Sequence, residues 1–392
     1  MKIKINSVQM VLGALSLLLF SFNAQAVPSY ARQTNLACAA CHTIFPELTP
    51  FGRSFKLNGY TLTGLKGVEA QPTASASGVK IGSVAPMAAM LQVNASNSGS
   101  GNEYAMPNEF SLFFAGEISP KMGSFIQMTM APPEGETSFS MDNADVRYAT
   151  HSGDTTWGVT INNSPTVQDL WNSTPVWGYP FTGGADVQQP LIADGLGQNV
   201  MGLGAYAQMA NGLYAELTLY QPLNSDIVTP GDGTTATSLK EYSPYVRVAW
   251  QKGLSNGDNL MIGAYGMQST LVATGSDKVT DMAVDTQYEH PLKGGNLISA
   301  HASYTNEKLD AGIGTSSSYT LNALRLDAGY HWGSHAEAVL GYASNSNADT
   351  AAAVTAQYSY LPWQNTKFTV QYVHPTSGGG SDATLVQAWF MW

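Results

Sequence analysis

The stretch GLYAELTLY, residues 212–220, alternates between apolar and polar side chains along its whole length. One face of an extended chain would carry Leu213, Ala215, Leu217 and Leu219, and the other Tyr214, Glu216, Thr218 and Tyr220. Because successive side chains of a β-strand point to opposite sides, the stretch predicts a strand with one apolar and one polar face. The stretch FSLFFAGEI, residues 110–118, alternates in the same way.

Segments of this kind recur from Val84 to Trp392, and we count about sixteen of them. Their expected starts are Ala85, Asn108, Met122, Ser140, Thr156, Leu196, Gly212, Tyr242, Asn259, Lys278, Asn296, Tyr319, Ser334, Ala351, Thr366 and Ser381. Short connections such as ANG and WGSH alternate with long ones such as residues 164–195 and 223–240. Bacterial outer-membrane barrels have an even number of antiparallel strands, with short periplasmic turns and longer outer loops. The sequence therefore predicts an all-β fold, a transmembrane antiparallel β-barrel over residues 81–392 with both termini on the periplasmic side.

The composition favours the same fold. Only 11% of the residues are charged, against about 25% in an average soluble domain. Glycine and tyrosine are abundant, with 39 and 19 residues, as expected for a barrel that faces lipid on one side and water on the other. The chain ends in TLVQAWFMW, an alternating strand with a terminal aromatic residue, which is similar to the assembly signal of outer-membrane barrels.

Residues 1–26 have the features of a signal peptide. Lys2 and Lys4 precede an apolar run over residues 10–20, and Ala24 and Ala26 form a small-x-small cleavage site. The apolar run is about half of the ~20 residues that a spanning helix needs, which argues against a membrane anchor. The sequence thus predicts export and an outer-membrane protein surrounded by lipid. The formal net charge of −11 disfavours nucleic acid as a partner and favours cations.

The chain has two cysteines, and both lie in the motif CAACH at Cys38, Cys41 and His42. A Cys-x-x-Cys-His motif in an exported protein predicts covalent haem c, with two thioether bonds from the cysteines and the histidine as proximal iron ligand. The alternative is a disulfide or thiol-exchange pair, but no thioredoxin-like strand–helix pattern surrounds the motif. We therefore predict a small α/irregular cytochrome c segment over residues 27–63, followed by a polar linker over residues 64–80.

The sixth iron ligand is not evident, because no His or Met lies between Thr43 and Pro86. Met90 is the nearest thioether on a polar strand face and is our candidate distal ligand. Five histidines are rival donors: His290, His301, His331, His335 and His374. Arg53 and Lys56 are candidate partners of the haem propionates. Four aromatic residues could wall the ring: Phe45, Phe51, Phe55 and Tyr60.

The stretch PSYARQTNLACAACHTIFPELTPFGRSFKLNGY, residues 28–60, resembles the N-terminal signature of the fused outer-membrane cytochrome-porins of iron-oxidising bacteria. The match extends beyond the haem motif through FPELTPFGR. The resemblance implies a haem in or under the barrel that takes electrons from an extracellular donor, Fe(II), and passes them to a periplasmic carrier resembling cytochrome c. It implies the haem roles of Cys38, Cys41 and His42, and it does not identify the sixth ligand.

Two other functions remain open at this point. The chain could be a diffusion porin with a haem-bearing plug or sensor, in which residues 164–195, with Trp171, Trp177 and Tyr179, constrict the pore. It could also be a haem enzyme that activates a small molecule at an open coordination position, or an Fe(II) oxidase. Carboxylates on the polar strand faces could attract Fe(II), a cation that accepts oxygen ligands, although any polar pore lining contains such residues.

Overall fold

The computed structural model describes residues 28–65, 85–131, 138–174, 187, 189–197, 199–223, 238–272, 277–312, 317–346, 352–378 and 380–392. The predicted signal peptide and most of the predicted linker lie outside these residues. None of the helices in the described part of the chain is both long enough and apolar enough to cross a membrane.

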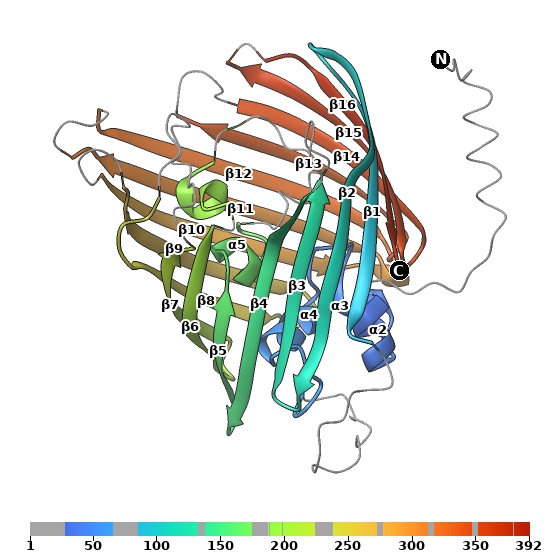
Figure 1. Ribbon diagram of the computed structural model, residues 1–392. Coiled ribbons are helices and arrows are strands. Elements are labelled where there is room, and N and C mark those ends of the chain that lie inside the picture. The colour runs from blue at the N-terminus through green and yellow to red at the C-terminus, as the bar shows by residue number, and fades with distance from the viewer. Residues whose placement is uncertain are drawn as a thin grey trace.

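The fold is a closed barrel of sixteen antiparallel strands, as the sequence predicted (Figure 1). Each strand pairs with its neighbours in the chain, and β1 pairs with β16 to close the sheet. The strands are β1 Met87–Ser98, β2 Gly101–Ser119, β3 Met122–Ala131, β4 Ser138–Ser152, β5 Thr155–Asn162, β6 Val200–Gln208, β7 Leu213–Pro222, β8 Ser243–Gly253, β9 Asn259–Thr270, β10 Lys278–Pro291, β11 Leu297–Asp310, β12 Tyr319–Trp332, β13 Ala336–Asn345, β14 Ala352–Trp363, β15 Thr366–Ser377 and β16 Ala383–Met391.

The two faces of the strands differ as the alternation predicted. In β7, Leu217 and Leu219 are 51% and 45% exposed on the outside of the barrel, whereas Thr218 and Tyr220 are fully buried in its interior. Closure of the sheet leaves no unpaired edge, so the backbone can be surrounded by lipid without unsatisfied polar groups. The apolar exterior and the closed sheet make the chain an outer-membrane barrel.

Several exposed aromatic side chains lie at one end of the barrel. Trp157, Trp250, Trp332 and Tyr360 all lie on the outer surface near the short turns. Such girdles mark the membrane–water interface of transmembrane barrels. The start of β1 and the end of β16 lie at this same end, since Met90 pairs with Met391, and the prediction places it in the periplasm.

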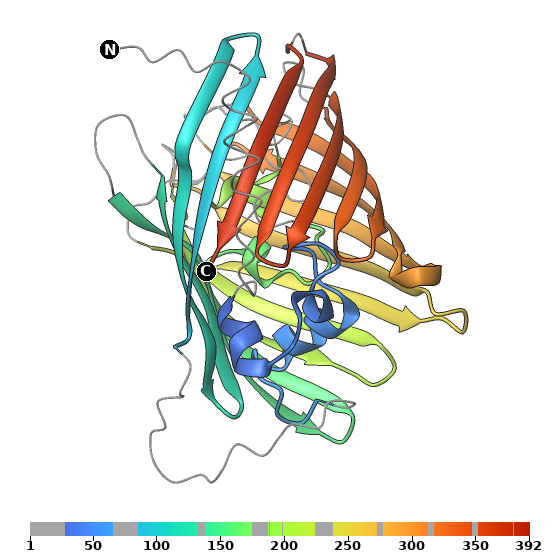
Figure 2. The ribbon, with the colours of Figure 1, turned by 90° about the vertical axis from the view of Figure 1, so that its right-hand side faces the viewer.

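The N-terminal segment forms three short helices at the mouth of the barrel with the short turns (Figure 2). They are α2 Pro28–Thr34, α3 Cys38–Cys41 and α4 Pro50–Leu57. The start of α4 is specified locally, because Pro50 occupies its first turn and the Thr49 side chain accepts a hydrogen bond from Gly52 N at 3.0 Å. The segment is helical and irregular, as predicted.

A second segment folds inward from the long connection between β5 and β6. It contains α5 Pro165–Gln168 and the π-helical turn η2 Leu191–Gly195, and α5 lies within the barrel outline in Figure 1. Leu191, Ile192 and Leu196 are buried in an apolar cluster against lumen-facing side chains such as Tyr220 and Val279. The 3₁₀ turn η3 Lys293–Gly295 joins β10 to β11. In the described part of the chain, the interior of the barrel is therefore packed by two segments, the N-terminal one and the described residues of this connection, 163–174, 187, 189–197 and 199, which we call the inward loop.

Candidate cofactor site in the barrel mouth

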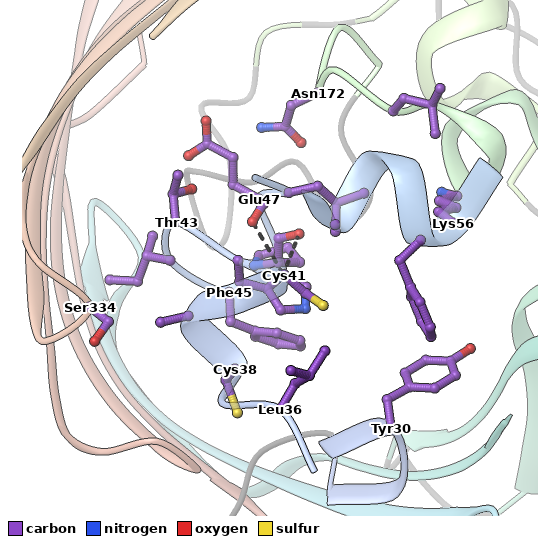
Figure 3. Close-up of a pocket in the computed structure, with 18 of the residues that line it drawn as sticks. Tyr30, Leu36, Cys38, Cys41, Thr43, Phe45, Glu47, Lys56, Asn172 and Ser334 are labelled. Atoms are coloured by element: carbon purple, nitrogen blue, oxygen red, sulfur yellow. Dashed lines mark hydrogen bonds between the residues drawn. The ribbon is translucent and has the colours of Figure 1, made fainter. Parts of the chain in front are cut away.

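A cavity of about 340 Å³ lies where the N-terminal segment meets the inward loop (Figure 3). The N-terminal side contributes residues that include Tyr30, Cys38, Cys41, His42 and Phe55. The inward loop contributes Thr166, Val167, Asp169, Leu170, Trp171 and Asn172, and turns at the barrel mouth contribute Ser334, His335 and Gln364. The volume lies within the range of small-molecule and cofactor sites, roughly 300–1,000 Å³.

The helix α3 presents the predicted attachment residues to this cavity. Cys38 and Cys41 lie at its two ends and are not joined to each other by a disulfide, and Figure 3 shows the sulfur of Cys41 directed into the open space. The side chain of Thr49 holds α3 by donating a hydrogen bond to Ala40 O at 2.6 Å. Gly52 lets α4 approach α3, since a Cβ at this position would lie 2.1 Å from Cys41 O.

His42 follows α3 directly and is oriented by backbone carbonyls. Its Nδ1 lies 3.2 Å from both Pro46 O and Glu47 O. A carbonyl oxygen only accepts hydrogen bonds, so Nδ1 carries the proton and Nε2 carries the lone pair. Burial lowers the pKa of His42 to about 4, although the two backbone hydrogen bonds act in the opposite direction. A neutral imidazole held through its second nitrogen is the form in which histidine binds a metal.

The Cys41 thiol is poorly suited to disulfide exchange. Burial, and to a smaller extent the neighbouring Cys38, raises the pKa of Cys41 to about 11. Exchange proceeds through the thiolate, and reactive Cys-x-x-Cys pairs have a pKa lowered to between ~3.5 and ~7.5. The environment of Cys41 therefore argues against the thiol-exchange alternative.

The lining residues fit a haem. Apolar and aromatic side chains form most of the wall, among them Leu36, Ile44, Phe45, Leu361 and Trp171. Tyr30 stacks on Tyr60 with ring centroids 5.7 Å apart and meets Phe55 edge-on at 5.3 Å. Cys38 and Cys41 would hold the ring through thioethers, and His42 Nε2 would face the iron.

The structure places Met90 beside the cavity, behind one of its walls. Its side chain is fully buried in the lumen with Phe113, Trp389 and Met391, and Phe45 packs against this cluster. Phe45 lines the cavity, whereas Met90 does not. As a distal ligand Met90 stays a prediction, and Tyr30, Phe45 and Phe125, which pack against its cluster, all line the cavity.

The rival histidines are distributed differently. Among them only His335 lines the cavity. His301 is buried between Glu47 and Asp327, at 3.1 and 2.6 Å, and His331 contacts Ser299 at 2.8 Å. His290 and His374 pair with Asp258 and Asp382 at the barrel ends.

Of the two candidate propionate partners, Arg53 and Lys56, only Lys56 lines the cavity. Arg53 is turned away from the cavity to the barrel wall, where Nη1 and Nη2 donate to Glu289 at 3.0 and 2.7 Å. Lys56 lines the cavity and donates to Val167 O at 2.5 Å and to Asp169 O at 2.9 Å. Phe51 lies outside the cavity lining, whereas Phe45, Phe55 and Tyr60 belong to it.

The lumen carboxylates serve mainly to hold the interior together. Asp145 accepts hydrogen bonds from Tyr60 and Arg147, and Asp285 pairs with Arg247. Throughout the described ranges, no group of three or more His, Cys, Asp or Glu side chains converges as a metal site. The polar faces thus act as a scaffold for the N-terminal segment and the inward loop.

The sequence did not identify the contribution of the inward loop to the cavity. Under the porin alternative it offered residues 164–195 as a pore constriction, and of its residues Trp177 and Tyr179 lie outside the described part of the chain. Nothing local indicates that Val167, Asp169 and Trp171 face Cys38, Cys41 and His42. The contact is made by Lys56, more than a hundred residues away in the chain. Long-range contacts of this kind leave no periodicity in a single sequence.

Comparisons with known proteins bear on the barrel. No family model matches the sequence, and no curated protein matches it. Solved structures with a similar fold include the outer membrane channel DcaP of Acinetobacter baumannii, with 11% identity and a TM-score of 0.52 over 78% of this chain and 96% of that chain. They also include an anion-selective porin from Comamonas acidovorans, with 13% identity and a TM-score of 0.51 over 78% and 98% of the two chains. Identities this low show a shared porin-like barrel fold and nothing finer.

Proposed function

We propose that this outer-membrane barrel carries one covalent haem c and transfers single electrons from an extracellular donor, Fe(II), to a periplasmic carrier. The observation that carries the proposal is the convergence of Cys38, Cys41 and His42 on one cavity. His42 is neutral there and bonded through Nδ1, so that Nε2 keeps its lone pair. The resemblance of residues 28–60 to the cytochrome-porins supports the choice of donor and carrier.

When bound, haem supplies a one-electron Fe(III)/Fe(II) couple. The chain's own residues hold it in place. Cys38 and Cys41 would hold one edge of the ring, and the carbonyls of Pro46 and Glu47 orient the imidazole of His42. The apolar lining residues would exclude water from the ring. The bidentate pair of Arg53 and Glu289, both buried, fixes the segment to the barrel wall.

The position of the cavity explains why a haem segment would be fused to a barrel. An electron cannot cross a hydrocarbon core of ~30 Å without a relay. The inward loop covers the cavity on one side, whereas Ala37 and Ala39, which flank Cys38, are exposed at the mouth with the short turns. A haem in this cavity would stand inside the barrel with one edge close to the periplasmic mouth, where a soluble carrier can dock.

The second candidate is a diffusion porin with the N-terminal segment as plug. The porin-like fold favours it, since 96–98% of the channel and porin chains named above match this barrel. The packing of the interior argues for a fixed plug, because Tyr60, Arg53 and Leu57 each contact the wall through buried hydrogen bonds. A haem enzyme remains the third candidate, and it would need an open coordination position.

One preparation tests these functions. The full chain is produced with its signal peptide in a host that matures c-type cytochromes, and haem absorbance is followed after addition of Fe(II) at neutral pH. We expect covalent haem that is reduced rapidly, and loss of this reduction in His42→Ala. High single-channel conductance with slow reduction would favour the porin. Rapid carbon monoxide binding by the reduced protein would favour the enzyme. Absence of covalent haem would refute the proposal.

A further inference from the structure

Lys56 occupies a distinctive position in the cavity. It lies in the last turn of α4 and is the only lysine or arginine among the described residues that line the cavity. Figure 3 shows Lys56 and Tyr30 across the open space from Cys41 and Phe45. A positive charge therefore stands opposite the thiols that would attach the ring.

Among the described residues, Lys56 uses two of its three N–H donors in hydrogen bonds. A lysine ammonium has three N–H donors, and two of them reach Val167 O at 2.5 Å and Asp169 O at 2.9 Å. Both acceptors are neutral carbonyl oxygens, so these bonds do not neutralise the charge. The side-chain carboxylate of Asp169 is engaged elsewhere, since it accepts from Trp171 N and Thr174 N.

Arg53, the other candidate cation of this segment, is already neutralised. Its guanidinium makes a bidentate pair with Glu289, and a third hydrogen bond reaches Leu48 O at 2.7 Å. Moving Arg53 toward the cavity would leave Glu289 buried without its partner, which costs several kcal/mol. Of the two, Lys56 is the residue that can meet a carboxylate in the cavity.

The chemistry of haem c defines where its two propionate carboxylates would lie. The two thioether positions lie on one edge of the macrocycle, and the two propionates lie on the opposite edge. With the thioethers fixed at Cys38 and Cys41, the propionates extend away from α3. The side of the cavity across from Cys41 is the side on which Lys56 stands (Figure 3).

We propose that Lys56 is the carboxylate-binding residue of this cavity and that its third N–H donates to a haem propionate. The inference rests on the proposed function and adds a residue role to it. Lys56 then connects three parts: α4, the inward loop through Val167 O and Asp169 O, and the edge of the cofactor. A buried charge-assisted hydrogen bond of this type is stronger than a neutral one.

The role has a measurable consequence for the haem. A cation close to the propionates disfavours the ferric state, which carries one more positive charge than the ferrous state. Replacing Lys56 with Met removes that cation and leaves the negative charge of the propionate near the iron uncompensated. We expect the midpoint potential of Lys56→Met to fall. At a fixed potential, the ferric-to-ferrous ratio should rise about tenfold, which is ~59 mV for one electron.

The experiment is a spectroelectrochemical titration of the haem-loaded full chain. Lys56→Arg keeps the charge and should retain the wild-type potential. Lys121→Met makes the same substitution at an exposed lysine in the turn between β2 and β3, and it should also leave the potential unchanged. If Lys56→Met does not assemble, Lys56→Gln provides the same measurement, because its amide keeps two N–H donors without the charge.

Two results would overturn the role of Lys56 while the proposed function stands. One is covalent haem with the same potential in wild type and Lys56→Met. The other is a change of spin state or axial ligation in Lys56→Met, which would show that the amine binds iron. A wild-type protein without covalent haem would instead overturn the proposed function itself.

Discussion

Replacement of Gly52 by Ala tests how closely the haem motif is packed against α4. A Cβ at Gly52 would lie 2.1 Å from the oxygen and 2.9 Å from the carbon of the Cys41 carbonyl. These are backbone atoms of α3, so no rotamer change can relieve the clash. The two helices would have to separate by roughly 1 Å or more to restore ordinary contact, and such overpacking typically costs about 1–3 kcal/mol.

Only the N-terminal segment should respond, because the clash lies wholly within it. We expect the population of the opened segment to rise about 5- to 150-fold, the factor that corresponds to this cost. Limited trypsin digestion measures it, since cleavage after the buried Arg53 requires α4 to open and follows the open population when opening is fast. Gly253→Ala is the control, because its nearest neighbour, the side-chain oxygen of Asn259, lies at an ordinary 3.6 Å. Equal cleavage rates in Gly52→Ala and the wild type would refute the packing argument.

Three further predictions concern the docking of this segment. Glu289→Gln removes the charge that pairs with Arg53. Because a buried unpaired charge costs several kcal/mol, tryptic cleavage after Arg53 should accelerate at least tenfold. The control is Glu103→Gln at an exposed position, and an unchanged cleavage rate in Glu289→Gln would show that the pair does not hold the segment. In a haem-free protein lacking both cysteines, docking should tighten as the pH rises from about 8 to 10.5. Burial lowers the pKa of Lys56 to about 8 from an ordinary 10.5, so between these pH values the open state binds one more proton than the docked state. The free energy of docking therefore gains at most about 3 kcal/mol as the pH rises. Lys56→Met should abolish this pH dependence, and a pH dependence that persists in Lys56→Met would have to come from another group. Deletion of residues 27–63 should raise single-channel conductance severalfold, whereas an unchanged conductance would mean that the segment does not obstruct the lumen.

The barrel could be predicted from the sequence because its determinants are local. Each strand must present one face to lipid and the other to the interior, so apolar and polar side chains alternate with a period of two in every strand segment. The predicted starts at Met122, Asn259, Lys278, Tyr319 and Thr366 coincide with the observed ones. Short turns precede the starts at Met122, Asn259 and Thr366 and give a clear boundary there.

The start of β2 was predicted too late, at Asn108 instead of Gly101. Residues 101–107, GNEYAMP, show no apolar alternation. They are nevertheless paired with the end of β1, from Ser98 opposite Gly101 to Asn94 opposite Ala105. Backbone pairing across a tight hairpin continues here beyond the segment whose side chains show the alternation, and a pattern based on side chains cannot detect it.

The site was predictable only where its residues are adjacent in the chain. Cys38, Cys41 and His42 form a contiguous motif, and the structure brings them to one cavity as expected. The distal side is built from segments far apart in sequence, so alternation could show that Met90 faces the interior but not that it lies outside the cavity lining, in a cluster against which Phe45 packs. Likewise, composition could not separate Arg53 from Lys56, because the difference between them lies in Glu289, on β10.

The buried ion pairs are better understood as positioning devices than as sources of stability. A buried pair gains little over apolar packing, but it strongly disfavours any arrangement that leaves one charge alone. Arg53 with Glu289 fixes the N-terminal segment, and Arg247 with Asp285 holds Ser173 of the inward loop. Lys56 then joins the two segments across the cavity. Displacing either segment would leave charges in the lumen without their partners, so the two segments should dock together. An electron-transfer site requires a fixed distance between the haem motif and the inward loop, whereas a gated pore does not.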